Sequence, residues 1–265
     1  MKNIYFSKRF IFRLIILFYV FAVNITCKKS SVDDASSEKI TLAVAANAQY
    51  ALSEIIAAFE KKYSVKPQMT VSSSGKLTAQ IIHGAPFDIF LSADMKYPQT
   101  LYEKKYSDKP PDVYAYGSLI LWTQKKEILP DSLKKLSALK FDKIAVANPR
   151  NAPYGEQAVY ALKNAGIYGA LRKKIVYGES VSQTNHYILS GSVDIGITAK
   201  STLFSPIIEK KKYIRDVETN LYEPIKQGVI KLKRANTNKT ANEFYAFLFS
   251  DEAKKILRDF GYLTP

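Results

Sequence analysis

The stretch ITLAVAANAQYALSEIIAAFEKK, residues 40–62, decides the fold class of this 265-residue chain. Its first part, Ile40–Ala45, is a short apolar run of the kind that forms a strand buried inside a sheet. The part from Tyr50 to Lys62 spaces its apolar residues along one helix face, at Leu52, Ile55, Ile56 and Phe59. The stretch therefore predicts a buried strand that is followed by a helix.

The same unit recurs along the rest of the chain. We predict further strands at 67–72, 89–91, 115–123, 144–147 and 193–198. We predict further helices at 77–83, 97–104, 158–165, 241–249 and 252–260, with Gly166 capping the end of the helix at 158–165. Strands that alternate with helices at this spacing form parallel sheets with helices on their faces, so the fold class is α/β.

Two loops of this pattern lie where ligands bind in such sheets, beyond the carboxyl ends of the strands. Ala45-Ala46-Asn47 joins the first strand to its helix, and Ser72-Ser73-Ser74-Gly75 joins the second strand to its helix. Either loop alone is explained as a helix cap, because Ser and Asn are preferred there. Together they offer backbone N–H groups at two helix starts, short polar side chains and, at Gly75, close backbone approach. This combination predicts an anion site that needs no charged side chain.

Three motifs in this region resemble the periplasmic molybdate-binding proteins of ABC uptake systems. They are AANA at 45–48, SSGKL at 73–77 and, most specific of the three, GAPFDIFLSAD at 84–94. The likeness continues through 144–162 and 179–196 and covers nearly all of the chain from Ile40 to the C-terminus.

The resemblance implies a two-lobed type II periplasmic-binding-protein fold. In this fold each lobe is a mainly parallel sheet flanked by helices, and the ligand lies in the cleft between the lobes. The chain crosses between the lobes twice, so that residues 40–116 and 218–265 build lobe I and residues 117–217 build lobe II. We expect a monomer.

The resemblance also places the ligand contacts. The donor of the first loop falls at Asn47, the donor of the second loop at Ser74, and contacts from lobe II at Tyr154 and, through the backbone, at Val181. Many members carry a tyrosine hydroxyl where this chain has Ala199, and we expect Tyr154 to supply the missing hydroxyl. No cofactor is implied, and the metal of the oxyanion is reached only through its oxygen atoms.

The function implied by the resemblance is the capture of molybdate or tungstate for an ABC importer. Neutral hydrogen bonds from both lobes hold the oxyanion, the lobes close over it by a hinge motion, and the closed form docks on a membrane permease. Sulfate or phosphate remains open as the bound anion. An enzyme or a sensor on the same bilobal scaffold also remains open, because a fold does not fix a function.

Groups suited to catalysis are scarce in the sequence. Ser73 and Ser74 have no paired base and do not stand in a nucleophile elbow. Asp88 and Asp94 would suit a carboxylate pair, but they flank a short strand and are better explained as a strand anchor and a helix cap. The two histidines lie on unrelated segments without further metal ligands around them. We therefore expect a binding protein and not an enzyme.

The N-terminal residues are typical of an export signal. Four basic residues precede Leu14–Val23, an apolar run of ten residues that suits a signal peptide and is short for a membrane span. We predict a signal peptide at 1–26 and lipid modification of Cys27, the single cysteine of the chain. Residues 27–39 are then a flexible tether that anchors the protein to the membrane in the cell envelope or periplasm.

The chain is strongly basic, with a formal net charge of +15 at pH 7. Cleavage after residue 26 removes four positive charges and no acidic residue, which leaves +11. The basic residues are mostly lysines in short runs, and no nucleic-acid-binding motif accompanies them. We therefore expect no nucleic-acid partner and interpret the charge as a solvated surface that steers anions.

Overall fold

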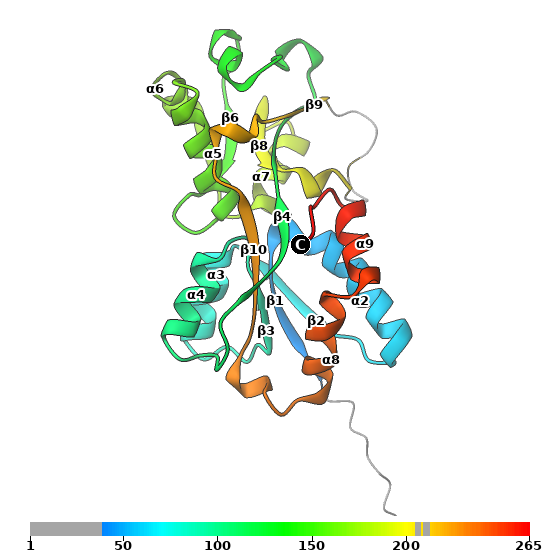
Figure 1. Ribbon diagram of the computed structural model, residues 1–265. Coiled ribbons are helices and arrows are strands. Elements are labelled where there is room, and N and C mark those ends of the chain that lie inside the picture. The colour runs from blue at the N-terminus through cyan, green and yellow to red at the C-terminus, as the bar shows by residue number, and fades with distance from the viewer. Residues whose placement is uncertain (1–38, 205–207, 209–212) are drawn as a thin grey trace, which may run out of the picture. The chain divides into compact units, whose positions relative to one another are not determined.

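Two five-stranded sheets organise residues 39–204, 208 and 213–265, which are the residues that the computed structural model describes (Figure 1). The first sheet has the strand order β2-β1-β3-β10-β4, and the second has the order β7-β6-β8-β5-β9. In the first sheet β10 runs antiparallel to both of its neighbours, and in the second sheet β5 does the same. The other two pairs of each sheet are parallel, so each sheet is mixed: four of its five strands run in the same direction, and one runs against them.

The described strands and helices have the following bounds. The strands are β1 (Thr41–Ala45), β2 (Gln68–Ser72), β3 (Ile89–Leu91), β4 (Asp112–Gly117), β5 (Leu119–Thr123), β6 (Ile144–Ala147), β7 (Ile175–Gly178), β8 (Ile195–Ala199), β9 (Tyr213–Asp216) and β10 (Ile225–Lys231). The α-helices are α2 (Gln49–Tyr63), α3 (Ser74–Ile82), α4 (Lys96–Glu103), α5 (Pro153–Asn164), α6 (Tyr168–Leu171), α7 (Val181–Leu189), α8 (Lys239–Leu248) and α9 (Asp251–Asp259). A short 3₁₀ segment follows the central strand β8 and another follows β1: these are η5 (Lys200–Phe204) and η1 (Ala46–Ala48).

Helices cover both faces of the first sheet. α2, α8 and α9 pack on one face, and α3 and α4 pack on the other (Figure 1). Leu42 and Val44 of β1 belong to the first of these layers, whereas Ala43 belongs to the second. A strand buried on both faces has apolar residues at successive positions, which explains the unbroken apolar run in β1. Phe59 of α2 packs edge-on against Phe244 of α8, with ring centroids 5.2 Å apart.

The second sheet is also covered on two faces. α5 packs against β6 and β8 on one face, where Leu162 and Ile144 share a buried cluster. α7 packs on the other face, where Ile188 shares a second cluster with Trp122 and Ala145. We use "first lobe" and "second lobe" below for the two sheets with the helices that cover them.

The chain passes between the two sheets twice. The first passage is the single residue Ser118 between β4 and β5, and the second is 217–224 between β9 and β10. The prediction of one strand over 115–123 is therefore wrong: Tyr116 pairs with Lys226 in the first sheet, whereas Leu119 pairs with Ala199 in the second. Only Gly117 and Ser118 separate the strand-forming residues on the two sides of the passage, so the sequence does not mark the change of partners.

The other predicted strands and helices are confirmed, with shifts at their ends. Gly166 follows the end of α5 with a φ of 75°, a conformation that glycine adopts without strain. The sequence pattern did not predict β7, β9, β10, the short helix α6 or α7. All four residues of β9 are exposed, and the run Lys226-Gln227-Gly228 interrupts the apolar pattern of β10.

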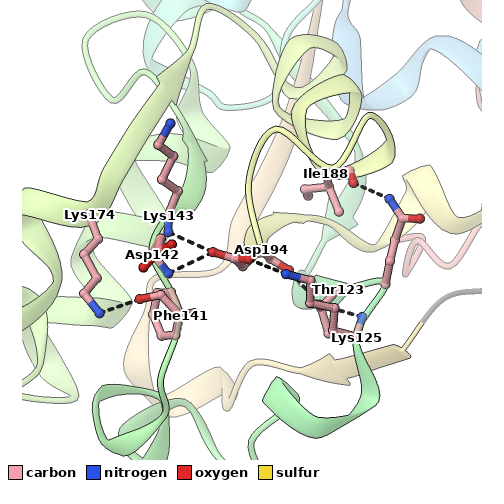
Figure 2. Close-up of polar contacts among 9 residues, drawn as sticks. Thr123, Lys125, Phe141, Asp142, Lys143, Lys174, Ile188 and Asp194 are labelled. Carbon is pink, nitrogen blue, oxygen red and sulfur yellow. Dashed lines mark hydrogen bonds and ion pairs between the residues drawn. The ribbon is translucent and has the colours of Figure 1, made fainter.

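An aspartate ties strand starts together in each lobe. Asp194, directly before β8, accepts the two backbone N–H groups that precede β6, at 2.8 and 3.0 Å, and Lys125 Nζ at 2.6 Å (Figure 2). The hydrogen bond from Lys125 holds the pKa of Asp194 down, at about 2. Asp88, directly before β3, accepts the N–H of Thr41 at the start of β1, at 2.7 Å. The role of Asp88 as a strand anchor is thus confirmed.

The predicted signal peptide at 1–26 and the lipidation site Cys27 lie outside the described residues, as does all of the 27–39 tether except Lys39. Within 39–204, 208 and 213–265, no helix combines the length and the apolar character that crossing a membrane requires.

Candidate anion-binding site

Asn47, the predicted first-loop donor, is buried in η1 between β1 and α2. Its side-chain Nδ2 donates to Gln227 Oε1 at 2.7 Å and to Tyr262 Oη at 2.8 Å. An amide nitrogen has two hydrogens, and both are used inside the protein. The donor that this position still offers is the backbone N–H of Asn47, in the first turn before α2, where N–H groups have no partner within the helix.

Ser74, the predicted second-loop donor, begins α3 and is buried. Its Oγ accepts the N–H of Ala93 at 3.0 Å, which leaves its hydroxyl hydrogen to donate. Ser73 precedes it as the N-cap residue, but its side chain makes no bond to the helix, and its buried Oγ has no hydrogen-bond partner. An N-cap serine ordinarily accepts an N–H of the first turn. The sequence singles out Ser74 alone, because it does not tell which serine hydroxyl bonds to the helix; the unpartnered hydroxyl makes Ser73 a further candidate.

Tyr154 is the second residue of α5 and is 2% exposed. Its hydroxyl has no hydrogen-bond partner. Asn47 and Tyr262 nevertheless lie close enough to affect the pKa of Tyr154. Burial raises the pKa of Tyr154 well above its usual value, so the group is a neutral donor at physiological pH. A Cβ on Gly117, at the end of β4, would lie 1.9 Å from this hydroxyl oxygen. Glycine at the first passage therefore makes the room that the hydroxyl occupies.

Val181, the predicted backbone contact, begins α7. The helix is capped by Ser180, whose Oγ accepts the N–H of Gln183 at 3.3 Å. The Val181 side chain is buried in one cluster with Tyr154, and α7 packs against η1 of the first lobe. The N–H of Val181 thus lies in a helix start that borders the first loop.

The structure brings all four predicted residues to one buried junction between the lobes. The buried cluster that holds Tyr154 and Val181 also holds residues 45–46, directly before Asn47, and Ala93, whose N–H donates to Ser74. The prediction from sequence that loops of both lobes converge here agrees with this packing. The assignment of these residues as ligand contacts stays a prediction.

Buried polar atoms without a partner gather at this junction. Among the described residues, six buried side-chain atoms have no hydrogen-bond partner. Four of them belong to the converging loops: Asn47 Oδ1, Ser73 Oγ, Asn151 Oδ1 and Tyr154 Oη. Because buried polar atoms are almost always paired, this concentration points to a polar ligand at the junction.

The junction is built without buried cations. No Lys or Arg is among the fully buried residues of the described chain. Asp94 is the nearby acid whose pKa is raised, to about 6, mainly by burial, with a smaller contribution from Glu156 of the second lobe. It accepts the N–H of Tyr97 in the first turn of α4, at 3.2 Å, so it bonds to the helix start as predicted, although Met95 is the N-cap residue. Such a site suits a ligand that accepts hydrogen bonds from neutral donors.

Metal ligation has no support among residues 39–204, 208 and 213–265, where no three His, Cys, Asp or Glu side chains gather in a suitable group. His83 and His186 are both exposed, one at the end of α3 and the other on α7. Ala199 ends β8 within the same buried cluster as Tyr154 and carries no donor. Tyr154 therefore remains our predicted source of the hydroxyl.

Direct bonds join the two lobes beside the junction. The N–H of Gly75 donates to Asn151 O at 2.9 Å, and Lys76 forms an ion pair with Glu179 at 2.9 Å. A Cβ on Gly75 would lie 2.9 Å from Asn151 Cα. The close approach predicted at Gly75 is thus an approach of the second lobe's backbone.

Comparison with known proteins identifies the family. The model of the bacterial extracellular solute-binding proteins matches residues 40–263. The chain belongs to this family. As a member of it, this solute-binding protein works outside the cytoplasm, and its site binds a solute and does not catalyse a reaction.

Several relatives of this solute-binding protein are similar over most of its length. The molybdate-binding protein ModA of Rhodobacter capsulatus is 35% identical over 234 residues, which is 87% of this chain and 90% of that protein. The putative ABC transporter substrate-binding lipoprotein YvgL of Bacillus subtilis (strain 168) is 28% identical over 260 residues, 97% of this chain and 98% of that protein. The solved structure of the periplasmic molybdate-binding protein of Azotobacter vinelandii matches with a TM-score of 0.80 at 28% identity, covering 86% of this chain and 100% of that one. The predicted two-lobed binding-protein fold is thereby confirmed.

Proposed function

We propose that the protein captures molybdate or tungstate outside the cytoplasm and delivers it to an ABC importer. The observation that carries this proposal is the pair of buried, unpartnered hydroxyls, Ser73 Oγ in the first lobe and Tyr154 Oη in the second. A fully ionised tetrahedral oxyanion only accepts hydrogen bonds, and it would meet donors from both sides. The names of the relatives above support this choice of ligand.

We propose the contacts at the four residues that the resemblance places, and the packing of their loops around one junction supports this choice. The backbone N–H of Asn47, the hydroxyl of Ser74, the hydroxyl of Tyr154 and the N–H of Val181 donate to the four corners of the anion. Ser73 adds a hydroxyl that the sequence did not single out. Each bond to a charged acceptor contributes about 1.5–3 kcal/mol, so four or five of them can offset the loss of the anion's water.

Specificity then comes from size, because every donor is neutral. Molybdate and tungstate have longer metal–oxygen bonds than the S–O bonds of sulfate, so a cavity that fits the larger ions holds sulfate loosely. The lobes, which we propose as 40–116 with 218–265 and 117–217, close on the ligand through contacts such as Gly75 N–H to Asn151 O. The closed form docks on the permease, and the protein acts as a monomer.

We also propose that Cys27 carries a lipid that holds the protein at the membrane. The support is the position of this cysteine directly after the predicted signal peptide and the similarity to a relative named as a lipoprotein. Mass spectrometry of the N-terminal peptide from detergent-extracted protein tests this: an acylated Cys27 is the expected product.

Hydrogen phosphate is a second candidate, favoured by one feature. Asn47 Oδ1 and Asn151 Oδ1 are buried acceptors without partners, and a protonated anion would give one of them a hydrogen. A fully ionised oxyanion has no hydrogen to give. The two candidates therefore differ in whether these amide oxygens take part in binding.

Calorimetric titration of the mature protein with molybdate, tungstate, sulfate and phosphate tests the function. We expect tight binding of molybdate and tungstate, with Tyr154→Phe weakening it about tenfold to a hundredfold through the loss of one charge-assisted bond. The control is Tyr160→Phe, which removes an exposed hydroxyl from the same helix and leaves affinity unchanged. Preference for sulfate, or no binding at all, would overturn the proposal, and preference for phosphate would establish the second candidate.

A further inference from the structure

The last residues of the chain reach back to the first loop. After α9 the chain turns at Gly261, whose φ is 76°, and Leu263 then pairs with Tyr116 of β4 through two backbone hydrogen bonds of 2.7 and 3.0 Å. This bridge lies at the end of β4, close to the first passage between the sheets. Tyr262 between these residues is directed inward and is 2% exposed.

Tyr262 and Asn47 are joined by two hydrogen bonds, although 215 residues separate them in sequence. Tyr262 Oη accepts a hydrogen from Asn47 Nδ2 at 2.8 Å and donates its own to Asn47 O at 3.0 Å. Ser201 in η5, which follows β8 of the second sheet, donates to the same carbonyl at 2.8 Å. The loop that begins α2 is therefore held from the C-terminus and from the second lobe.

Gln227 determines which way the side-chain amide of Asn47 is oriented. Its Nε2 donates to two backbone carbonyls, Ala93 O at 3.3 Å and Ile225 O at 3.0 Å. Its Oε1 must then accept, and the donor that meets it is Asn47 Nδ2 at 2.7 Å. The amide of Asn47 therefore has one possible orientation, and the second hydrogen of Nδ2 goes to Tyr262.

We propose that Tyr262 is a positioning residue of the anion site, which acts through Asn47. Its hydroxyl and Gln227 occupy the side-chain donors of Asn47, so the loop meets the anion with its backbone N–H groups and is held in place before the anion arrives. This inference rests on the proposed function. A loop that is ordered in advance loses less entropy on binding, and removing the Tyr262 hydroxyl therefore weakens the site without removing any group that touches the ligand.

Tyr262→Phe and Tyr114→Phe form a matched pair. Both tyrosines are buried within the first lobe, but the Tyr114 hydroxyl has no hydrogen-bond partner whereas the Tyr262 hydroxyl has two bonds to Asn47. Calorimetry with molybdate should show about a fivefold or greater loss of affinity for Tyr262→Phe and less than about twofold for Tyr114→Phe. Equal effects of the two variants would overturn the inference, because they would show only the cost of removing a buried hydroxyl.

A ligand-free measurement separates positioning from general loosening of the fold. In isotope-labelled protein the side-chain amide signal of Asn47, assigned as the one lost in Asn47→Asp, should exchange slowly with solvent. It should shift and exchange about tenfold faster in Tyr262→Phe but not in Tyr114→Phe. An unchanged amide signal in Tyr262→Phe would overturn the inference. If wild-type protein binds molybdate and Tyr262→Phe binds it equally well, the inference alone fails; if wild-type protein binds no oxyanion, the proposed function fails and the inference fails with it.

Discussion

Ser73 in the first lobe and Ser180 in the second occupy the same place in their sheets. Each follows an edge strand, β2 or β7, and each is the N-cap residue of the helix that comes next. Ser180 accepts the N–H of Gln183 and satisfies its helix start, whereas the Ser73 hydroxyl makes no such bond and is buried without a partner. The two serines thus occupy the same position in two sheets of the same topology, but the Ser180 hydroxyl caps its helix whereas the Ser73 hydroxyl is free to bond to a ligand.

The two sheets also differ at the ends where their parallel strands begin, although one aspartate stands at the same place in each. Asp88 and Asp194 each precede a central strand and accept an N–H at the start of the neighbouring parallel strand. Asp194 gathers two N–H groups and Lys125 (Figure 2). Asp88 has one N–H and a longer ion pair to Arg234, at 3.4 Å. The number of bonds per carboxylate therefore differs, although the position in the fold is shared.

The largest effect should come from removing the anchor with more bonds. We expect Asp194→Ala to lower the free energy of unfolding by about 3 kcal/mol and Asp88→Ala by about 2 kcal/mol, because each hydrogen bond to a charged group contributes about 1.5–3 kcal/mol and partial exposure reduces the sum. Urea denaturation at neutral pH measures both. A loss of stability for Asp88→Ala that exceeds the loss for Asp194→Ala would show that burial, not bond number, sets the strength of the anchor.

The pH dependence of the free energy of unfolding is a second measure of how much Asp194 stabilises the fold. The folded protein holds the pKa of Asp194 at about 2, below its ordinary value of 3.8, so the folded state favours the carboxylate. The stability that this gives is fully present above about pH 4 and is lost as the pH falls toward 2. Asp194→Ala should therefore lose less stability than wild type between about pH 4 and pH 2.5. An identical acid response in the two proteins would contradict the role of Asp194.

An intermediate effect is expected from the two cap serines. Ser73→Ala should weaken molybdate binding about tenfold or more and leave the melting temperature unchanged, because its hydroxyl has no partner inside the protein. Ser180→Ala should lower stability by about 1 kcal/mol through the lost cap and change affinity less than about threefold. Calorimetry and thermal unfolding on both variants measure the contrast. If Ser73→Ala bound like wild type, its hydroxyl would not belong to the site.

Much of this site was predictable because it lies at helix starts. Ala45-Ala46-Asn47 and Ser73-Ser74 directly follow strands, and the chemistry of caps and helix dipoles is local, so the sequence shows it. These features depend on residues a few positions apart, which is the range that periodicity and spacing report.

The parts that escaped prediction depend on distant contacts. The sequence gives no sign that Tyr262 and Gln227 engage the amide of Asn47, since 215 and 180 residues separate them from it. The same holds for the change of sheet at Ser118, because strand-forming residues continue on both sides of it and the switch of partners is decided by packing. Tertiary hydrogen bonds of this kind become visible only when the fold is known.

The smallest effect should come from the ion pair between the lobes. Lys76 and Glu179 are each about half exposed, and Lys76 lowers the pKa of Glu179. Exposed pairs of this kind contribute little and are screened by salt. In a double-mutant cycle of Lys76→Met and Glu179→Gln, we expect a coupling of about twofold to fourfold in molybdate affinity at low salt, which disappears near 1 M salt.

The cycle is the right measurement because either single change also alters the charge beside an anion, and that effect cancels in the coupling. The control is the same cycle on Asp131 and Lys135, an exposed pair within the second lobe, at 2.9 Å. This pair is made in the open and closed forms alike, so its coupling in binding should be absent. A coupling as large for the control pair as for Lys76 and Glu179 would mean that the ion pair between the lobes has no special part in closure. The binding difference between the lobes would then come only from the serines at their helix starts, Ser73 and Ser180.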